Sequence, residues 1–271
     1  MKYIGMIESC YPSLSKSERK VADYIMLEKG NVIYETLLEV SKKINVGEAT
    51  ILRFVKKVGF NGFQDLKLQI AKEDQPENES YHENYIDSIA ANMTKTIENT
   101  KAVLDINSLN GSIRLIDNSK RVFFFGVGSS GLAASEAQSR FLRMGKVGMA
   151  VTDSHFQVMY SSIIGEDDVI IALSLSGHTK DIIETVKIAK SRQVKVIAIT
   201  NYALSPLAQL SDFVLLTAGK ENLLDGGSLI SKISQLYIID LLCTGYALIN
   251  KGKVLELKQK TAELLIDKTT T

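Results

Sequence analysis

The sequence is poor in cysteine and contains no long uninterrupted apolar run. Its two cysteines, Cys10 and Cys243, lie far apart, and neither belongs to a Cys-x-x-Cys pair. This argues against a disulfide framework and a cysteine-based zinc site, so we expect two ordinary buried or half-buried thiols. The apolar stretch at residues 236–249 is short and is interrupted by Asp240. We therefore expect a cytoplasmic protein without a membrane partner.

A large net charge of either sign is also lacking. The chain carries 32 lysines and arginines against 31 aspartates and glutamates, a formal charge of +1. A nucleic-acid partner would therefore have to bind a local basic surface rather than the whole molecule. What the chain does have is an ordinary globular composition, 45% hydrophobic and 23% charged over 271 residues, which is enough for two domains.

Two different patterns divide the chain at the acidic, proline-bearing stretch of residues 73–80. Before it, helical patterns occur without a strand signal. After it, residues 82–117 are predicted to be helical, and apolar runs then alternate with segments of helical spacing. The apolar runs fall at residues 121–125, 147–151, 168–173, 194–199 and 212–216.

This alternation predicts an all-α domain followed by an α/β domain, whose parallel five-stranded sheet forms a flavodoxin-like sandwich with helices on both faces. Ligands of such sheets bind beyond the carboxyl ends of the strands. The expected boundaries are 1–75 for the helical domain, 76–109 for a linker and connecting helix, 110–250 for the α/β domain, and 251–271 for a C-terminal helix and tail.

Two serine-rich loops lead from apolar runs into helical patterns. The first serine loop (residues 126–131) is Gly-Val-Gly-Ser-Ser-Gly, and the second serine loop (residues 174–179) is Ser-Leu-Ser-Gly-His-Thr. Backbone N–H groups and the positive end of a helix dipole favour an anion at such a place. Hydroxyl groups add neutral donors, and glycine lets the backbone come close. Two such loops predict a site for one compact phosphorylated ligand.

The first serine loop also fits a dinucleotide-binding turn. Its glycines have the Gly-x-Gly-x-x-Gly spacing, and Asp153 follows the next apolar run, where dinucleotide folds place an acid that binds ribose. Such a turn needs no hydroxyls at 129–130 and gives no reason for a second serine loop. We therefore favour a phosphorylated ligand over a nicotinamide or flavin, and we expect no cofactor and no metal.

The N-terminal domain contains a predicted helix-turn-helix. The segments Ser-Lys-Ser-Glu at 15–18 and Thr-Leu-Leu-Glu at 36–39 have the spacing of capping boxes, which start helices. The second of these helices is expected to end near Ile44, residues 45–47 to form a tight turn, and residues 48–58 to form the next helix.

The helix predicted at 48–58 has one apolar and one cationic face. The apolar face consists of Ile51, Val55 and Val58, flanked by Phe54 and Leu52. The opposite face consists of Ala49, Thr50, Arg53, Lys56 and Lys57. Residues 41–72 hold seven cations and two acids, a local charge of +5. This suits a helix that enters the major groove, although the solvated face of a three-helix bundle would show the same spacing.

Both halves of the chain resemble known families. The two serine loops and the Ile-Thr-Asn of residues 199–201 resemble a sugar isomerase (SIS) domain, from about residue 110 to 250. The segments Ser-Glu-Arg-Lys-Val-Ala-Asp-Tyr-Ile, Glu-Ala-Thr-Ile-Leu-Arg-Phe and Gly-Phe-Asn-Gly-Phe resemble the N-terminal domain of the RpiR/MurR family of bacterial transcription regulators. Gly47 departs from that family, which usually has a serine cap there; glycine caps a helix at a cost of only about a few tenths of a kcal/mol.

The resemblance implies two binding partners, operator DNA and a phosphorylated sugar or amino sugar. DNA is expected to contact Thr36, Ala49, Thr50, Arg53, Lys56 and Lys57. The phosphosugar is expected to contact Gly128, Ser129, Ser130, His155, Ser174, Ser176, Gly177, Thr179 and Lys232. We expect a homodimer or homotetramer that controls carbohydrate-catabolic genes, with repression the commoner pattern in the family.

The same kind of sheet also carries isomerases, which need a general base near C1 and C2 of the sugar. The candidate acids and bases near the loops are Glu136, His155, His178, Glu184 and Glu221. Each of them could equally lie on a solvated surface. The attached helix-turn-helix favours a regulator without catalytic residues, and a phosphosugar isomerase with a helical appendage is the alternative.

Overall fold

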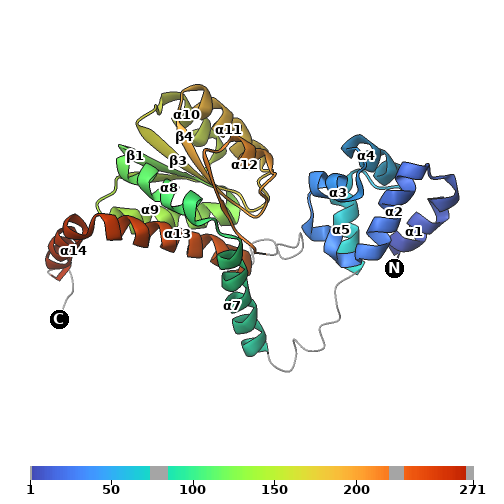
Figure 1. Cartoon of the computed structure of the whole chain (residues 1–271), viewed down its shortest axis with the longest axis horizontal. Helices are drawn as coiled ribbons and strands as arrows, with labels where there is room; N and C mark the ends of the chain where they lie inside the picture. The colour runs from blue at the N-terminus through green and yellow to red at the C-terminus, as the bar shows by residue number, and fades with distance from the viewer. Residues whose placement is uncertain (1, 74–84, 220–228, 267–271) are drawn as a thin grey trace. The chain divides into compact units, whose positions relative to one another are not determined.

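The computed structural model of the chain describes residues 2–73, 85–219 and 229–266 (Figure 1). Its described part divides into two compact units, one up to Ala90 and one from Ala91 onward.

The first unit is all-α. Its elements are α1 (Lys2–Cys10), η1 (Tyr11–Ser13), α2 (Lys16–Glu28), η2 (Lys29–Tyr34), α3 (Leu37–Ile44), α4 (Glu48–Lys57) and α5 (Phe63–Glu73). Both predicted capping boxes are confirmed. The Ser15 Oγ accepts from the Glu18 N–H at 3.3 Å, and the Thr36 Oγ1 accepts from the Glu39 N–H at 3.2 Å. In return, each glutamate carboxylate accepts from the N–H of its cap residue. The helices enclose a core that includes Ile25, Ile51 and Phe54, all fully buried.

Two helices precede the sheet in the region of residues 82–117, which were predicted to be helical. α7 (Tyr85–Val103) and α8 (Ile106–Asn118) are separated at Leu104 and Asp105. Asp105 starts the second helix, its carboxylate accepting from the backbone N–H groups of Asn107 at 3.3 Å and Ser108 at 2.9 Å.

The sheet has five parallel strands in the order β2-β1-β3-β4-β5. The strands are β1 (Arg121–Phe125), β2 (Gly148–Val151), β3 (Asp168–Leu173), β4 (Lys195–Thr200) and β5 (Phe213–Leu216). Each lies within one residue of a predicted apolar run. The predicted fold class, a helical domain followed by a parallel five-stranded α/β sandwich, is confirmed.

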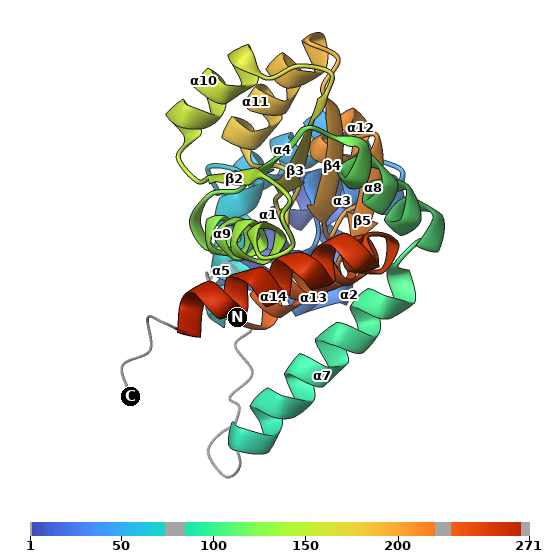
Figure 2. The ribbon, with the colours of Figure 1, turned by 90° about the vertical axis from the view of Figure 1, so that its left-hand side faces the viewer.

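Helices cover both faces of the sheet (Figures 1 and 2). Side chains alternate along each strand, so that Val122 and Phe124 face one core while Phe123 and Phe125 face the other. The first face is covered by α8, α9 (Gly128–Leu142) and α13 (Leu229–Ile249). The second face is covered by α10 (Ser154–Ile163), α11 (Lys180–Ser191) and α12 (Pro206–Leu210).

The predicted C-terminal helix is present as α14 (Lys251–Ile266). Its Val254 is buried in the core beneath α13 and α9. Its Leu257 packs over the turn after α9 so closely that a Cβ on Gly145 would lie 2.5 Å from the Leu257 Cδ2. The last residues of the expected tail, 267–271, lie outside the described residues.

α13 is more apolar than the sequence pattern suggested. Among the described residues, its segment Lys232–Ile249 is the one helix long and apolar enough to cross a membrane, judged by length and composition alone. In the structure, however, Ile238, Ile239 and Leu242 are buried in the core against α8 and α9. Packing in the α/β core therefore accounts for the apolar side of α13.

An ion pair joins the amino ends of β1 and β3. Arg121 donates to both carboxylate oxygens of Asp168, at 2.9 Å and 2.8 Å, and the Gly165 N–H adds a third bond at 3.1 Å. Burial of Asp168, which is 3% exposed, acts to raise the pKa of its carboxyl group, but these hydrogen bonds outweigh it and hold the pKa below the usual range.

We expect Asp168→Asn to lower the free energy of unfolding of the α/β unit by about 1–3 kcal/mol at pH 7, because the neutral amide cannot accept both guanidinium bonds. The folded-state pKa of Asp168 is lowered, so its contribution is complete above the unfolded-state pKa of about 4 and is lost as the pH falls through the folded-state value. Urea unfolding at pH 7 and below pH 4 measures this, with Asp167→Asn on the exposed neighbour as the control. A difference from wild type that persists unchanged at low pH would contradict the assignment.

Candidate anion site and nucleic-acid interface

The two serine loops lie at the ends of adjacent strands. β1 pairs directly with β3, with Phe125 opposite Ala172, so the first serine loop after β1 and the second after β3 leave the same edge of the sheet. From there the chain runs in opposite directions, through α9 to β2 and through α11 to β4, on opposite faces. In this topology, ligands usually bind between the two loops at which the chain direction reverses.

Among the described residues, the two helices that begin at these loops have no side-chain cap from their N-cap residues. Asp105, Asp153 and Ser205 cap α8, α10 and α12, each accepting from a backbone N–H of its helix. By contrast, Val127 precedes α9 without a side-chain hydrogen bond, and Thr179 precedes α11 likewise. The first N–H groups of α9 and α11 are therefore available to an anion, together with the positive ends of both helix dipoles.

The second serine loop is organised by its own hydroxyl groups. Ser174 and Thr179 hydroxyls are 2.8 Å apart, and the Ser174 Oγ also accepts from the Gly177 N–H at 3.1 Å. The exposed Ser176 accepts from the His178 N–H at 3.2 Å. Gly177 has φ +62°, and a Cβ there would lie 2.2 Å from the Ser205 Oγ, so only glycine fits.

Residues at the carboxyl end of β4 form hydrogen bonds with the backbone of the second serine loop. The Asn201 N–H and the Thr200 hydroxyl both donate to the Leu175 carbonyl, at 2.9 Å and 3.1 Å. The Ile-Thr-Asn segment at 199–201 thus holds the loop backbone, which places the predicted Ser174, Ser176, Gly177 and Thr179 together at one edge of the sheet.

The first serine loop is held by a residue that the sequence did not reveal. Gln235 of α13, 1% exposed, donates through its Nε2 to the Ser130 Oγ at 2.9 Å. Its Oε1 is buried without a hydrogen-bond partner among the described residues, a situation that costs about 1–3 kcal/mol. Gly128 and Ser129 begin α9 beside Ser130, so three predicted ligand residues lie together here.

His155 and Lys232 lie on the elements that flank the first serine loop. His155 is exposed in the first turn of α10, after β2, which is the strand next to β1. Lys232 is half-buried on α13, three residues before Gln235 and therefore on the same side of the helix. Asp153, the acid of the dinucleotide interpretation, is engaged as the cap of α10, accepting from the Phe156 N–H at 3.0 Å.

The candidate general bases do not share one element: Glu136 and Glu184 lie on α9 and α11, and His178 lies in the second serine loop. Glu136 is ion-paired with Arg140 at 2.8 Å, and Glu184 lies 3.9 Å from Lys180. His178 is exposed, with its Nδ1 2.6 Å from the Ser176 carbonyl oxygen. Glu221 lies outside the described residues. In the part of the chain that the structure describes, no three His, Cys, Asp or Glu side chains gather as a metal site would require.

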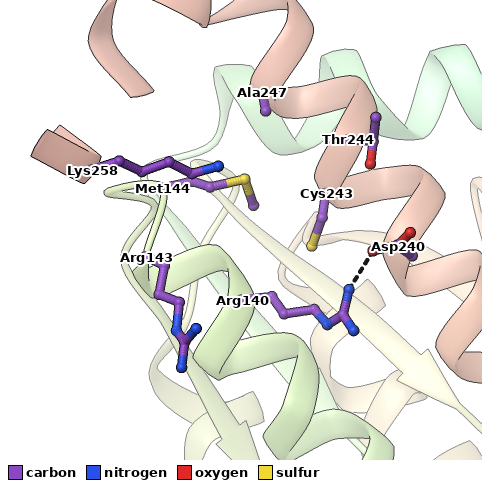
Figure 3. Close-up of a pocket in the computed structure, with 8 residues that line it drawn as sticks. All are labelled: Arg140, Arg143, Met144, Asp240, Cys243, Thr244, Ala247 and Lys258. Carbon is purple, nitrogen blue, oxygen red and sulfur yellow. Dashed lines mark hydrogen bonds and ion pairs between the residues drawn. The ribbon is translucent and has the colours of Figure 1, made fainter. Parts of the chain in front are cut away.

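A cavity of about 210 Å³ lies at the far end of α9 from the serine loops (Figure 3). Its lining residues are Arg140, Arg143, Met144, Asp240, Cys243, Thr244, Ala247 and Lys258. Arg140 bonds to Asp240 and Glu136, which balances its charge within the protein. Burial raises the pKa of Cys243 to about 12, so this thiol is neutral at pH 7, and both cysteines are free, as expected. None of the predicted ligand residues lines this cavity.

In the helical unit, the predicted helix-turn-helix is formed by α3 and α4. Asn45 ends α3 in the left-handed conformation, φ 51°, and the Val46 N–H bonds back to the Ser41 carbonyl at 3.1 Å. Ile51, Phe54 and Val55 bury one face of α4. Its outer face exposes Ala49, Arg53 and Lys56, and Arg53 donates to the Thr50 hydroxyl at 3.1 Å.

Several predicted contacts of this surface have other partners. Lys57 donates to the Ser13 carbonyl at 2.7 Å and to Glu18 at 3.2 Å, which ties α4 to the start of α2. The hydroxyl of Thr36 is engaged in its capping box. Leu52, expected to flank the buried face, is 37% exposed, whereas Phe54, expected to flank the same face, is fully buried.

The local charge of +5 is also smaller at the surface than the count suggested. Lys67 is buried, donates to the Glu35 carbonyl at 2.8 Å, and has a pKa lowered to about 8 by burial. Lys43 bonds to the Glu35 carboxylate at 2.7 Å. Together with Lys57, three of the seven cations therefore form hydrogen bonds or ion pairs within the helical unit.

Comparison with known proteins accounts for both units. A model of the rpiR-family helix-turn-helix domain matches residues 1–77, and the SIS domain model matches residues 115–245. An uncharacterized HTH-type transcriptional regulator of Clostridium perfringens is 39% identical over 278 residues, which cover 98% of this chain and 100% of the relative. The chain belongs to the RpiR family of transcriptional regulators. This protein is therefore a DNA-binding transcriptional regulator with an SIS domain.

Two further relatives span nearly the same length. The HTH-type transcriptional regulator HexR of Escherichia coli is 29% identical and is covered over 94% of its length, with 98% of this chain aligned. The structure of the Vibrio vulnificus NanR protein complexed with ManNAc-6P superimposes with a TM-score of 0.88 at 27% identity, covering 99% of this chain and 100% of that chain.

Lys56 and Lys57 are adjacent in sequence but differ in their contacts, which gives a matched pair. We expect Lys56→Met to reduce the slope of log affinity against log salt for a non-operator DNA duplex by about 0.9, as one lost phosphate contact does. Lys57→Met should leave that slope unchanged and lower the free energy of unfolding by about 1 kcal/mol, because its bonds lie within the protein. Equal slope changes in both variants would show that Lys57 leaves Glu18 to bind DNA.

Proposed function

We propose that this regulator binds the phosphate group of a phosphorylated sugar between its two serine loops and that this binding controls its affinity for operator DNA. The observation that carries the proposal is the pair of uncapped helices, α9 and α11, which begin on neighbouring strands. Their N–H groups, with the hydroxyls of Ser129, Ser176 and Thr179, supply hydrogen-bond donors suited to an acceptor-only phosphate.

An amino-sugar phosphate is the first candidate for the effector. The structural relative NanR, similar over the whole length of this chain, was solved with ManNAc-6P. The rim residues His155 and Lys232 flank the first serine loop on α10 and α13, where they could contact sugar hydroxyl groups or the phosphate.

For DNA, we propose that α4 enters the major groove with Ala49, Thr50 and Arg53 toward the base edges and Lys56 toward phosphate. A homodimer or homotetramer would place two such helices on a pseudo-palindromic operator, with half-sites about 34 Å apart. Repression relieved by the phosphosugar is the proposed sign of regulation. A coupling of about 1–3 kcal/mol, or roughly 5- to 150-fold in operator affinity, is typical of such switches.

The alternative function, isomerisation, has less support. Glu136 and Glu184 form ion pairs on their own helices, and full-length relatives are named as regulators. We propose that the chain binds phosphosugars without converting them.

The effector site is tested by thermal stabilisation of the purified protein with a panel of sugar phosphates including ManNAc-6P, the unphosphorylated sugars and NAD, with isomer formation followed in the same samples. We expect a shift with a phosphosugar and no turnover. Combined Ser176→Ala and Thr179→Ala should weaken this binding by on the order of 100-fold, since two hydrogen bonds to a charged group are lost. Ser191→Ala, at the other end of α11, is the control. Turnover, or a shift with NAD alone, would refute the proposal.

The DNA interface is tested with an operator selected from a random duplex pool. We expect Arg53→Ala to weaken operator binding by roughly 5- to 150-fold, the value of one bidentate base contact, while leaving the thermal shift by ManNAc-6P unchanged. Arg143→Ala removes the same charge from the α/β unit and serves as the control. Equal operator affinity in Arg53→Ala and wild type would remove Arg53 from the proposed recognition surface.

A further inference from the structure

Two buried glutamines hold the first serine loop from opposite faces of the sheet. Gln157 of α10 donates through its Nε2 to the carbonyls of Gly126 at 3.3 Å and Val151 at 2.7 Å. Gln235 of α13 donates to the side-chain oxygen of Ser130 at 2.9 Å. Both glutamines are buried, with 0% and 1% of their surface exposed. Their hydrogen-bond partners differ, because Gln157 donates to backbone carbonyls, whereas Gln235 donates to a side-chain hydroxyl group.

The bond from Gln235 determines what the Ser130 hydroxyl can still do. A serine hydroxyl has one proton to donate and two lone pairs that accept. Because Ser130 accepts the Nε2–H of Gln235, its own proton remains for another acceptor. Ser130 is the third residue of α9, beside the uncapped N–H groups of that helix. Its remaining donor therefore belongs to the same cluster of donors.

The other end of the Gln235 amide supports this interpretation. Its Oε1 is buried and has no partner within the described residues. An apolar side chain of similar shape would fill the same space without an unpaired oxygen, so the packing of α13 alone does not account for a glutamine here. The hydrogen bond to Ser130 is the interaction that an apolar residue could not supply.

We propose that Gln235 is a positioning residue of the phosphate site, which fixes the Ser130 hydroxyl as a donor toward a bound phosphate. This inference rests on the proposed function, because it assumes that phosphate binds at the first serine loop. Lys232 lies three residues earlier on the same side of α13. One helix would therefore bring both a cation and this amide to the loop, although Gln235 is 105 residues from Ser130 in the sequence.

A double-mutant cycle with ManNAc-6P and inorganic phosphate as probes tests the inference in the full chain. We expect Ser130→Ala to weaken binding of both probes by at least 10-fold and Gln235→Met by about 3- to 10-fold. In the Ser130→Ala background, Gln235→Met should change the affinity by less than 2-fold, because the hydroxyl on which it acts is gone. Gln157→Met, which removes a backbone contact, is the matched control and should weaken binding by the same factor with and without Ser130.

Gln235→Glu provides a second and opposite change. The carboxylate can only accept, so Ser130 would have to donate to it and could no longer donate to phosphate. We expect Gln235→Glu to weaken binding at pH 7 at least as much as Ser130→Ala does, whereas Gln235→Leu should behave as Gln235→Met does. Circular dichroism and the thermal midpoint without ligand establish that each variant is folded.

The outcomes separate the inference from the function on which it rests. If Ser130→Ala binds both probes as wild type does, the proposed phosphate site is wrong. If Ser130→Ala weakens binding but Gln235→Met has the same effect in both backgrounds, phosphate binds as proposed and the positioning role of Gln235 is overturned. Equal affinities of Gln235→Glu and Gln235→Met would also overturn it, since a packing role does not distinguish a donor from an acceptor.

Discussion

The parallel pairing of β1 with β3 is the constraint on which the candidate ligand site depends. The chain continues from β1 to one neighbouring strand and from β3 to the other. The two helices that follow these strands therefore begin at adjacent strand ends but cover opposite faces of the sheet. Arg121 and Asp168 join the same strand pair at its other end. An uncapped N-terminus on α9 or α11 alone would not indicate a ligand site. The two uncapped N-termini support such a site because they lie at adjacent strand ends.

The helical unit shows a different use of charge. Lys43, Lys57 and Lys67 hold α3, α4 and α5 to their neighbours, and the outer face of α4 is left with Arg53 and Lys56 beside Ala49 and the partly exposed Leu52. The surface available to DNA is therefore narrower and more mixed in character than the number of cations in the sequence indicates. A helix with a small, partly apolar first half can approach base edges closely.

The sequence predicted the elements well because their signals are local. Strands of a sheet that is covered on both faces leave continuous apolar runs even where, as in β2 and β5, they are only partly buried, and all five were predicted to within one residue at each end. The capping boxes before α2 and α3 could be recognised in the same way, and Asp105 at the start of α8 is a similar local signal. The family and the fold class also followed from the sequence, through the serine loops and the segment at residues 48–54.

Pairings between distant residues could not be predicted in the same way. The contact of Gln235 with Ser130 spans 105 residues, and that of Lys57 with Ser13 spans 44. Only the packing of α13 on α9, and of α4 on α2, brings these groups together. No sequence signal singled out Gln235, because α13 also carries Ser231, Ser234 and Asp240 among its apolar residues. For the burial of Lys67 we find no comparable signal.

The two serine loops contain no lysine or arginine, and this has a consequence for how the protein responds to its surroundings. A phosphate held by N–H dipoles and hydroxyl groups experiences forces that act over short distances, so mobile ions screen them little. Binding of DNA through exposed cations releases counterions and weakens steeply as salt rises. In the proposed regulator, Lys232 is the one lysine or arginine proposed to lie near the phosphate, so a rise in ionic strength would weaken DNA binding more steeply than phosphosugar binding.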